Sequence, residues 1–285
     1  MLSADQIAQY HRDGFIAVEG VYSPEDIAEM RRVTEDYVEQ SRAVTAHTEV
    51  LDLEPGHTAE APRLRRIKQP ADHHAVYRKA LHHAPMLDMV AQLIGPAMRV
   101  NSTKLNLKTG EFGSAVEWHQ DLAFYPHTNE DVLAVGVALD DMTVENGALM
   151  MVPGSHKGPV FDHHDNGYFV GAISDMACLE GGTVPIQMKA GSISIHHGRI
   201  VHGSAPNHSN KPRRLLLFEL RANDAWPLLG IPNWEDFNAR ILRGDPVQAP
   251  RVEPVPVRIP LPPPPTVGSI YEVQTHMRAK ILARQ

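Results

Sequence analysis

The tetrapeptide Trp118-His119-Gln120-Asp121 carries an imidazole and a carboxylate two positions apart. In an extended strand, side chains two apart point to the same face, so His119 and Asp121 would project together while Gln120 turns away. These two groups are ligands that suit a divalent first-row metal. The pattern is weak evidence by itself, because a chain with 17 histidines will contain it by chance. A metal site therefore needs a third ligand elsewhere.

A second histidine lies far downstream, in Val201-His202-Gly203-Ser204. Together with His119 and Asp121, His202 would complete a triad of two histidines and one carboxylate, which leaves open positions on Fe(II). Open positions suit a centre that activates oxygen, whereas a structural zinc site uses four protein ligands. The only cysteine, Cys178, excludes an internal disulfide framework and a thiolate cluster.

Two arginines, Arg213 and Arg214, begin an apolar run that follows His202. A guanidinium at this position can bind a carboxylate through two parallel, charge-assisted hydrogen bonds. We assign that role to Arg213. The residues alone leave open whether either arginine is instead an ordinary residue at the edge of a strand.

Taken together and in this order, these motifs resemble those of the phytanoyl-CoA dioxygenase (PhyH) family of Fe(II)/2-oxoglutarate oxygenases. The resemblance covers about residues 14–221 and is weakest in the first hundred. The segments that carry it are Trp118–Asp121, Asn146-Gly147 with Leu149, Pro153-Gly154-Ser155-His156, His202-Gly203-Ser204, Asn207, Ser209 and Arg213. The combination is far more specific than any one segment.

The resemblance implies a role for each matching residue. His119, Asp121 and His202 match the iron ligands. Arg213 matches the arginine that binds the distal carboxylate of 2-oxoglutarate, the one remote from its 2-oxo group. Ser204 stands where a supporting hydroxyl is often found in the family. Asn106, on the preceding strand, resembles a polar residue that contacts the co-substrate.

The resemblance also implies Fe(II), 2-oxoglutarate and O2 as the cofactors and co-substrates. The implied reaction is hydroxylation, or a related oxidation, of an unactivated C–H bond in a small-molecule metabolite, with release of succinate and CO2. In halogenating relatives a small residue replaces the carboxylate of the triad. Because Asp121 is present here, hydroxylation is favoured over chlorination.

Three further residues are expected to edge the substrate pocket, namely Tyr125, Lys104 and His197. On a strand His196 and His197 face opposite ways, so at most one of them can point into the site, and we assign that position to His197. Five other histidines are expected in surface positions or loops: His127, His156, His163, His164 and His208.

The elements that must position these residues change character near residue 98. Residues 1–97 predict helices, with a Ser3-x-x-Gln6 capping box, a second start at Ser23-Pro24 and a helical block over residues 72–94. Residues 43–61 predict a loop. Residues 98–222 predict short strands separated by Gly, Pro, Asn and Asp, at residues 99–108, 115–119, 132–139, 149–152, 184–189, 192–197 and 213–221.

This order predicts a mainly β fold with flanking helices. Because helices do not alternate with the strands, a parallel sheet is disfavoured, and two packed sheets in a jelly roll are favoured. The resemblance implies the double-stranded β-helix, a jelly-roll, cupin-like core. We expect one PhyH-like oxygenase domain over residues 1–285.

The C-terminal part has an unusual composition. Residues 246–266 are rich in proline and predict an extended segment along the surface. Its aliphatic side chains are expected to pack on the same chain, namely Val252, Val255, Val257, Ile259 and Leu261. Residues 267–285 predict a C-terminal helix.

Composition excludes several classes of protein. With 42% hydrophobic and 21% charged residues among 285, the chain is not disordered throughout. Its formal charge of −7 argues against a nucleic-acid or anionic-membrane binder and disfavours a CoA thioester, whose phosphates need cations. Neither a membrane span nor a signal peptide is evident, so a cytoplasmic protein with a small-molecule substrate is expected.

Two alternatives stay open beside the oxygenase hypothesis. The chain could be a non-catalytic, metal-retaining jelly-roll binding protein, or a zinc-dependent hydrolase that works without O2 or 2-oxoglutarate. The residues do not identify the substrate or the oligomeric state.

Overall fold

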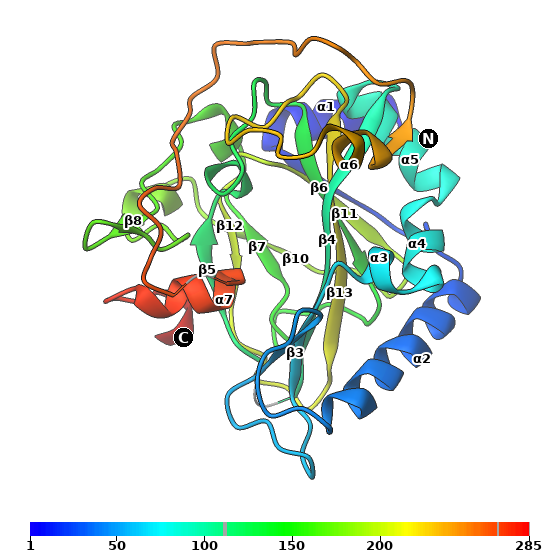
Figure 1. The fold of residues 1–285 in the computed structure, drawn as a ribbon, viewed down its shortest axis with the longest axis vertical. Coiled ribbons are helices and arrows are strands. Elements are labelled where there is room, and N and C mark those ends of the chain that lie inside the picture. Colours follow the sequence, from blue (N-terminus) through cyan, green and yellow to red (C-terminus); the bar gives the residue numbers. More distant parts are fainter. Residues whose placement is uncertain (111–112, 267, 285) are drawn as a thin grey trace.

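Two antiparallel sheets form the centre of the computed structural model, which describes residues 1–110, 113–266 and 268–284 (Figure 1). The larger sheet has the strand order β1-β11-β6-β13-β4-β3-β2, and β14 also pairs with β4. Its strands are β1 (Phe15–Val18), β11 (Ile193–His197), β6 (Val132–Ala138), β13 (Arg213–Ala222), β4 (Met98–Lys108), β3 (Leu64–Lys68), β2 (Leu51–Leu53) and β14 (Ile241–Arg243).

The smaller sheet has the order β10-β7-β12-β5 and faces the larger one. Its strands are β10 (Val184–Ile186), β7 (Leu149–Met151), β12 (His202–Ser204) and β5 (Val116–His119). A separate hairpin joins β8 (His164–Asp165) to β9 (Tyr168–Phe169). This pair of facing antiparallel sheets confirms the expected jelly-roll core with flanking helices.

The alternation of side chains along β13 separates two apolar layers. Leu216, Phe218 and Leu220 pack in the cluster shared with the helices. Leu215 and Leu217 point to the other face and pack with residues of the smaller sheet. Strand periodicity therefore directs the residues of β13 that share a face with Leu215 into the space between the sheets.

Helices cover the outer face of the larger sheet (Figure 1). They are α1 (Ala4–Asp13), α2 (Pro24–Ser41), α3 (Pro70–His73), α4 (Ala75–Leu81) and α5 (Ala84–Ile94). The predicted capping box at Ser3 and Gln6 is present, and Gly14 ends α1 with a φ of 86°. The predicted block over residues 72–94 is divided among α3, α4 and α5.

The sequence prediction did not include β2, β3, β8, β9, β12 and β14, and the first two of these help to shape the larger sheet. β2 lies inside the stretch expected to be a loop, and β3 has the sequence Leu-Arg-Arg-Ile-Lys, in which charged residues break the apolar alternation. β3 forms because it pairs with β4, a long-range contact that no local pattern reports.

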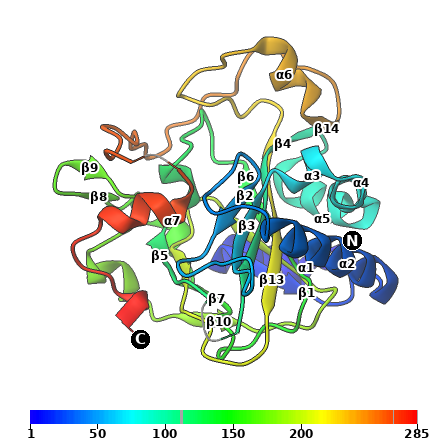
Figure 2. The same cartoon turned by 60° about the horizontal axis from the view of Figure 1, so that its bottom comes forward.

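The C-terminal part runs over the surface (Figures 1 and 2). After α6 (Trp234–Ala239) the proline-rich segment has no regular secondary structure. Its side chains do not pack as expected, because four of the five aliphatic residues are exposed: Val252, Val257, Ile259 and Leu261. An extended polyproline segment presents side chains on all sides, so few of them can face the protein.

The expected helix over residues 267–285 is much shorter in the structure. Within residues 268–284, which the structure describes, only α7 (Ile270–Val273) is α-helical, and 3₁₀ turns follow at Gln274–His276 and Leu282–Arg284. Both views place α7 beside β5 (Figures 1 and 2).

Among the residues that the structure describes, no helix combines the length and the apolar character that a membrane span requires.

Candidate metal centre

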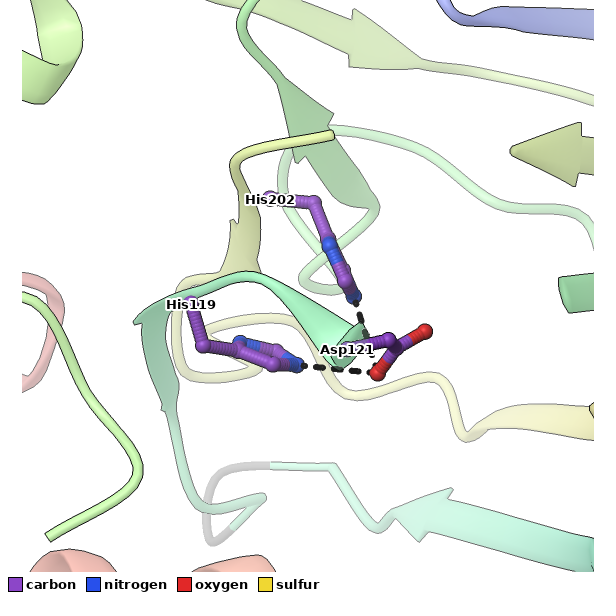
Figure 3. Close-up of side chains that lie close together, drawn as sticks. All are labelled: His119, Asp121 and His202. Atoms are coloured by element: carbon purple, nitrogen blue, oxygen red, sulfur yellow. Dashed lines mark ion pairs between the residues drawn. The ribbon is translucent and has the colours of Figure 1, made fainter. Parts of the chain in front are cut away.

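The pairing of β12 with β5 places His202 directly opposite His119. β5 ends at His119, and Gln120 keeps an extended backbone (φ −122°, ψ 127°) before Asp121 begins a 3₁₀ turn. The Oδ1 atom of Asp121 lies 3.7 Å from Nε2 of His119 and 3.9 Å from Nε2 of His202 (Figure 3). The candidate ligand atoms of all three residues lie within 4.8 Å of one another. The structure thus brings the three predicted ligands together.

Backbone carbonyls fix the two imidazoles in the form that binds metals. His119 Nδ1 lies 2.8 Å from the carbonyl oxygen of Glu117, and His202 Nδ1 lies 3.1 Å from that of Ile200. A carbonyl only accepts, so each Nδ1 carries the proton and each Nε2 keeps its lone pair toward Asp121. Burial lowers the pKa of both rings, to about 4 for His202, which keeps them neutral at physiological pH.

Asp121 is ionised in this setting. Burial by itself would raise the pKa of Asp121, but the neighbouring His202, His196 and Lys104 outweigh that effect and hold it well below its usual range. One ionised carboxylate and two neutral imidazoles form a donor set that fits Fe(II). Among the described residues the group has three members, so its donor count matches an open centre rather than a closed zinc site.

Gln120 turns away from the metal ligands, as predicted, and fastens the turn that carries Asp121. Its amide nitrogen donates to the carbonyls of Arg199 and Pro159, at 2.7 and 3.1 Å, and its oxygen accepts from Phe161 N at 2.8 Å. Its backbone N–H donates to Nε2 of His163 at 2.9 Å. His163 is buried, as are His127 and His156, so none of the three is a surface residue. His127 and His163 do lie outside the helices and named strands, in agreement with the loop alternative.

The triad opens into a cavity between the two sheets. Its polar lining, apart from the triad, consists of Arg66, Lys104, Asn106, His196, Ser204, Arg213 and Tyr271. Four of the predicted site residues are in this set, namely Asn106, Lys104, Ser204 and Arg213.

Strand alternation distinguishes Arg213 from Arg214. Arg213 shares the face of Leu215, is fully buried and donates from Nη2 to the carbonyl of Gly147 at 2.7 Å. Burial lowers its pKa to about 10, so it stays cationic at neutral pH. Arg214 points to the helix side, where its guanidinium binds both carboxylate oxygens of Asp140 at 2.8 and 2.7 Å. Of these two arginines, only Arg213 lines the cavity and can contact a ligand there.

Two strands supply the other charged groups of the cavity wall. Nε of Arg66, on β3, donates to Asn106 Oδ1 at 2.8 Å, and Nζ of Lys104 lies 2.6 Å from Glu219 Oε1. Sequence reasoning missed Arg66 because β3 itself was missed. The adjacent pair Arg65-Arg66 in a strand was the available signal, since one of two neighbouring arginines must face inward.

Tyr125 lies beside the triad without lining the cavity. Burial and the carboxylates of Asp121 and Glu219 raise its pKa well above the usual value, so its hydroxyl stays protonated. Tyr125 is not among the residues that line the cavity, so its expected place at the edge of the substrate pocket stays a prediction.

The structure places His197 elsewhere, contrary to the expectation. His197 lines a second cavity together with Tyr10, His156 and Arg199. His196 points into the metal cavity instead, with Nε2 at 3.4 Å from Asp121 Oδ2. The signal was present in β11, because His197 shares its face with Ile193 and Ile195, which pack in the helix-side core.

Comparison with known proteins agrees with this geometry. The phytanoyl-CoA dioxygenase (PhyH) family matches residues 10–215. A protein of Stutzerimonas stutzeri named "Probable alpha-ketoglutarate-dependent hypophosphite dioxygenase" is 34% identical, over 91% of this chain and 92% of its own length. An L-proline trans-4-hydroxylase of Streptomyces griseoviridis is 29% identical, over 75% of this chain and 84% of its own.

Among solved structures, EctD from S. alaskensis with 2-oxoglutarate and 5-hydroxyectoine superposes with a TM-score of 0.68. It is 25% identical and covers 90% of this chain and 88% of its own. Family match, full-length relatives and the buried triad point the same way: the chain belongs to the phytanoyl-CoA dioxygenase (PhyH) family, within the iron- and 2-oxoglutarate-dependent dioxygenases.

Proposed function

We propose that this chain hydroxylates a small-molecule substrate in a reaction that consumes 2-oxoglutarate and O2 and releases succinate and CO2. The observation that carries the proposal is the presence, in one cavity, of the His119–Asp121–His202 triad and the cationic Arg213. The first would hold the metal and the second would hold a dicarboxylate co-substrate.

The metal ligands and Arg213 would have separate roles in this reaction. His119 and His202 offer neutral Nε2 atoms and Asp121 offers an anionic oxygen, a set that would hold Fe(II). When bound, Fe(II) with 2-oxoglutarate supplies the oxidising chemistry. Arg213 binds and orients the distal carboxylate of the co-substrate, with Ser204 as a nearby hydroxyl in the same wall.

The remaining wall protects the reaction. Ala134, Leu149, Leu215 and Leu217 give the cavity apolar surface. A substrate that fills this space displaces water from the metal side, which limits unproductive oxidation. No side chain is assigned as a general base, because the proposed oxidation does not begin with abstraction of a proton.

The charges of the cavity favour a small anionic substrate. Besides Arg213, the wall carries Arg66 and Lys104, of which Lys104 is paired with Glu219 behind the wall. Asp121 is the only carboxylate among the described lining residues. The name of the S. stutzeri relative includes hypophosphite, a small inorganic anion, as the compound that it oxidises. Hypophosphite is therefore the first substrate to test, together with ectoine and L-proline, which appear in the names of other relatives.

The test is a substrate panel with the Fe(II)-loaded enzyme, measuring O2 uptake and succinate together. A true substrate should raise both above the rate without substrate, in a one-to-one ratio, and omission of 2-oxoglutarate should abolish both. Activity that persists without O2 would favour a hydrolase. Binding without succinate, in a fully iron-loaded protein and across the panel, would favour a non-catalytic binding protein.

A further inference from the structure

The C-terminal segment contributes one polar side chain to the metal cavity. Tyr271, on α7, lies beyond the family match of residues 10–215 and lines the cavity together with Ile270. The side chain is 5% exposed. Its hydroxyl has no hydrogen-bond partner within the described part of the chain. A buried hydroxyl without a hydrogen-bond partner is unfavourable. A ligand that accepts from it would gain the full binding free energy of the new hydrogen bond, because no existing bond has to be broken.

Two guanidinium groups share the cavity with this hydroxyl. The Arg66 guanidinium carbon lies 5.0 Å from the centre of the Tyr271 ring. Arg213 lines the same wall. Burial raises the pKa of Tyr271, and the nearby charges of Arg66 and Arg213 act to lower it. Arg213 uses Nε and Nη2 on a single carbonyl, that of Gly147, and Nη1 has no partner among the described residues. The wall thus offers a phenol O–H and spare guanidinium N–H groups to one anion.

We propose that the Tyr271 hydroxyl donates to the distal carboxylate of 2-oxoglutarate, alongside Arg213, so that α7 completes the co-substrate site. The inference rests on the proposed function, because it presumes 2-oxoglutarate in this cavity. A carboxylate has two oxygens with about four acceptor positions, so it can take two bonds from Arg213 and one from Tyr271. An anionic substrate has the same acceptor chemistry, and the experiment below separates the two.

The segment around Tyr271 is held firmly enough to serve as part of a binding site. Glu117, two residues before His119, accepts the backbone N–H groups of Ile281, Leu282 and Ala283 at 2.8–2.9 Å. The backbone N–H of Glu117 donates in turn to the side chain of Gln274 at 3.0 Å.

The Tyr271 side chain is also held directly. The Arg65 guanidinium lies 4.4 Å from the ring centre and pairs with Glu272. A hydroxyl fixed in advance loses little freedom on binding, so its bond adds to affinity.

The test compares Tyr271→Phe with the wild type in calorimetric titrations of the Mn(II)-loaded protein. The two ligands are 2-oxoglutarate and 2-oxobutyrate, which keeps the 2-oxo acid but lacks the distal carboxylate. We expect the Kd for 2-oxoglutarate to rise about ten- to a hundredfold, the effect of one hydrogen bond to a charged group. The Kd for 2-oxobutyrate should change less than twofold. Tyr168→Phe, which removes an exposed hydroxyl on β9, is the matched control and should change neither.

Each other outcome overturns the inference. An unchanged Kd for 2-oxoglutarate in Tyr271→Phe, or an equal rise for both ligands, would exclude a bond to the distal carboxylate. A raised KM for a substrate anion with unchanged 2-oxoglutarate binding would assign the hydroxyl to the substrate. If Arg213→Ala weakens 2-oxoglutarate binding while Tyr271→Phe does not, the proposed function survives and only the role of Tyr271 fails. Wild-type protein that binds no 2-oxoglutarate in the presence of metal would refute both.

Discussion

Two cavities containing buried histidines lie on opposite faces of β11, and only one has the features of a metal centre. His196 faces the triad, whereas His197 faces a second cavity together with His156 and Arg199. The decisive difference is the hydrogen bond at Nδ1. In the triad Nδ1 of both histidines faces a carbonyl, but Nδ1 of His197 accepts the backbone N–H of Arg199 at 3.0 Å.

That difference sets which nitrogen can bind a metal. The triad histidines keep a lone pair on Nε2, whereas His197 must carry its proton there and can only donate. The acids near His197 are also occupied, since Glu130 pairs with Arg199 and Asp131 with Arg251. A count of histidines therefore does not locate a metal site, and the partners of each ring do.

The largest expected contrast is between one substitution in each cavity. His119→Ala should remove Fe(II) binding and lower succinate formation about 1,000-fold or more, because the metal supplies the whole oxidation. His197→Gln should keep both within about twofold. Metal content by elemental analysis and succinate release measure the two effects. Equal loss in both variants would contradict the difference between the two cavities, and loss of folding in His119→Ala by circular dichroism would mean that the triad is structural.

A second contrast compares the neighbouring arginines of β13. Arg213→Ala should raise the KM for 2-oxoglutarate about 30- to 100-fold, since it removes a buried, charge-assisted pair of hydrogen bonds. Arg214→Ala should leave this KM nearly unchanged and lower the thermal midpoint instead, because Asp140 loses one of its two arginine partners and keeps only Arg31. Steady-state kinetics with varied 2-oxoglutarate and a melting curve give both readouts. If KM rose in Arg214→Ala and not in Arg213→Ala, Arg214 and not Arg213 would bind the co-substrate.

His196 should have an intermediate effect on metal binding. Its Nε2 lies 3.4 Å from the Asp121 oxygen that does not face the other two ligands, so it helps to orient the carboxylate. His196→Phe should weaken Fe(II) binding about tenfold, as loss of a group that supports a metal ligand generally does. Competition with a metal chelator gives the affinity. Binding as tight as that of the wild type would show that Asp121 is oriented without His196.

The second cavity should affect the pH dependence of protein stability and not the binding of iron. Burial lowers the pKa of His197 to about 3. The unfolded chain, with an ordinary value near 6.5, therefore takes up the proton first, and stability is lost as pH falls below about 6.5. His197→Gln should remove about 1–2 kcal/mol of the stability that the wild type loses between pH 7 and pH 5. Urea unfolding at the two pH values checks this, and an equal loss in both proteins would contradict it.

The sequence predicted the parts of the site whose chemistry is carried by local patterns. The seven predicted strands of the core are present within a few residues, because alternation and turn residues mark them. His119 and Arg213 lie in those strands and Asp121 follows one of them directly, whereas His202 lies in β12, a short strand that the prediction did not include. Their convergence in one cavity follows from the pairing of β12 with β5 and from the alternation along β13.

The residues that were missed depend on long-range packing. Arg66 enters the cavity only because β3 pairs with β4, and Tyr271 only because the C-terminal segment is fastened to Glu117. The direction of His196 and His197 depends on which face of β11 meets the helices. Ile193 and Ile195 indicate that face, because both pack in the helix-side core. The sequence analysis nevertheless assigned His197, which shares their face, to the site.

The central claim is that the triad and Arg213 form one site for iron and 2-oxoglutarate. The most direct test is the visible spectrum of the anaerobic protein with one equivalent of Fe(II) as 2-oxoglutarate is added. We predict a weak charge-transfer band that saturates with 2-oxoglutarate, is absent in His202→Ala, and needs much more 2-oxoglutarate in Arg213→Ala. A fully iron-loaded wild-type protein that develops no such band would contradict the account.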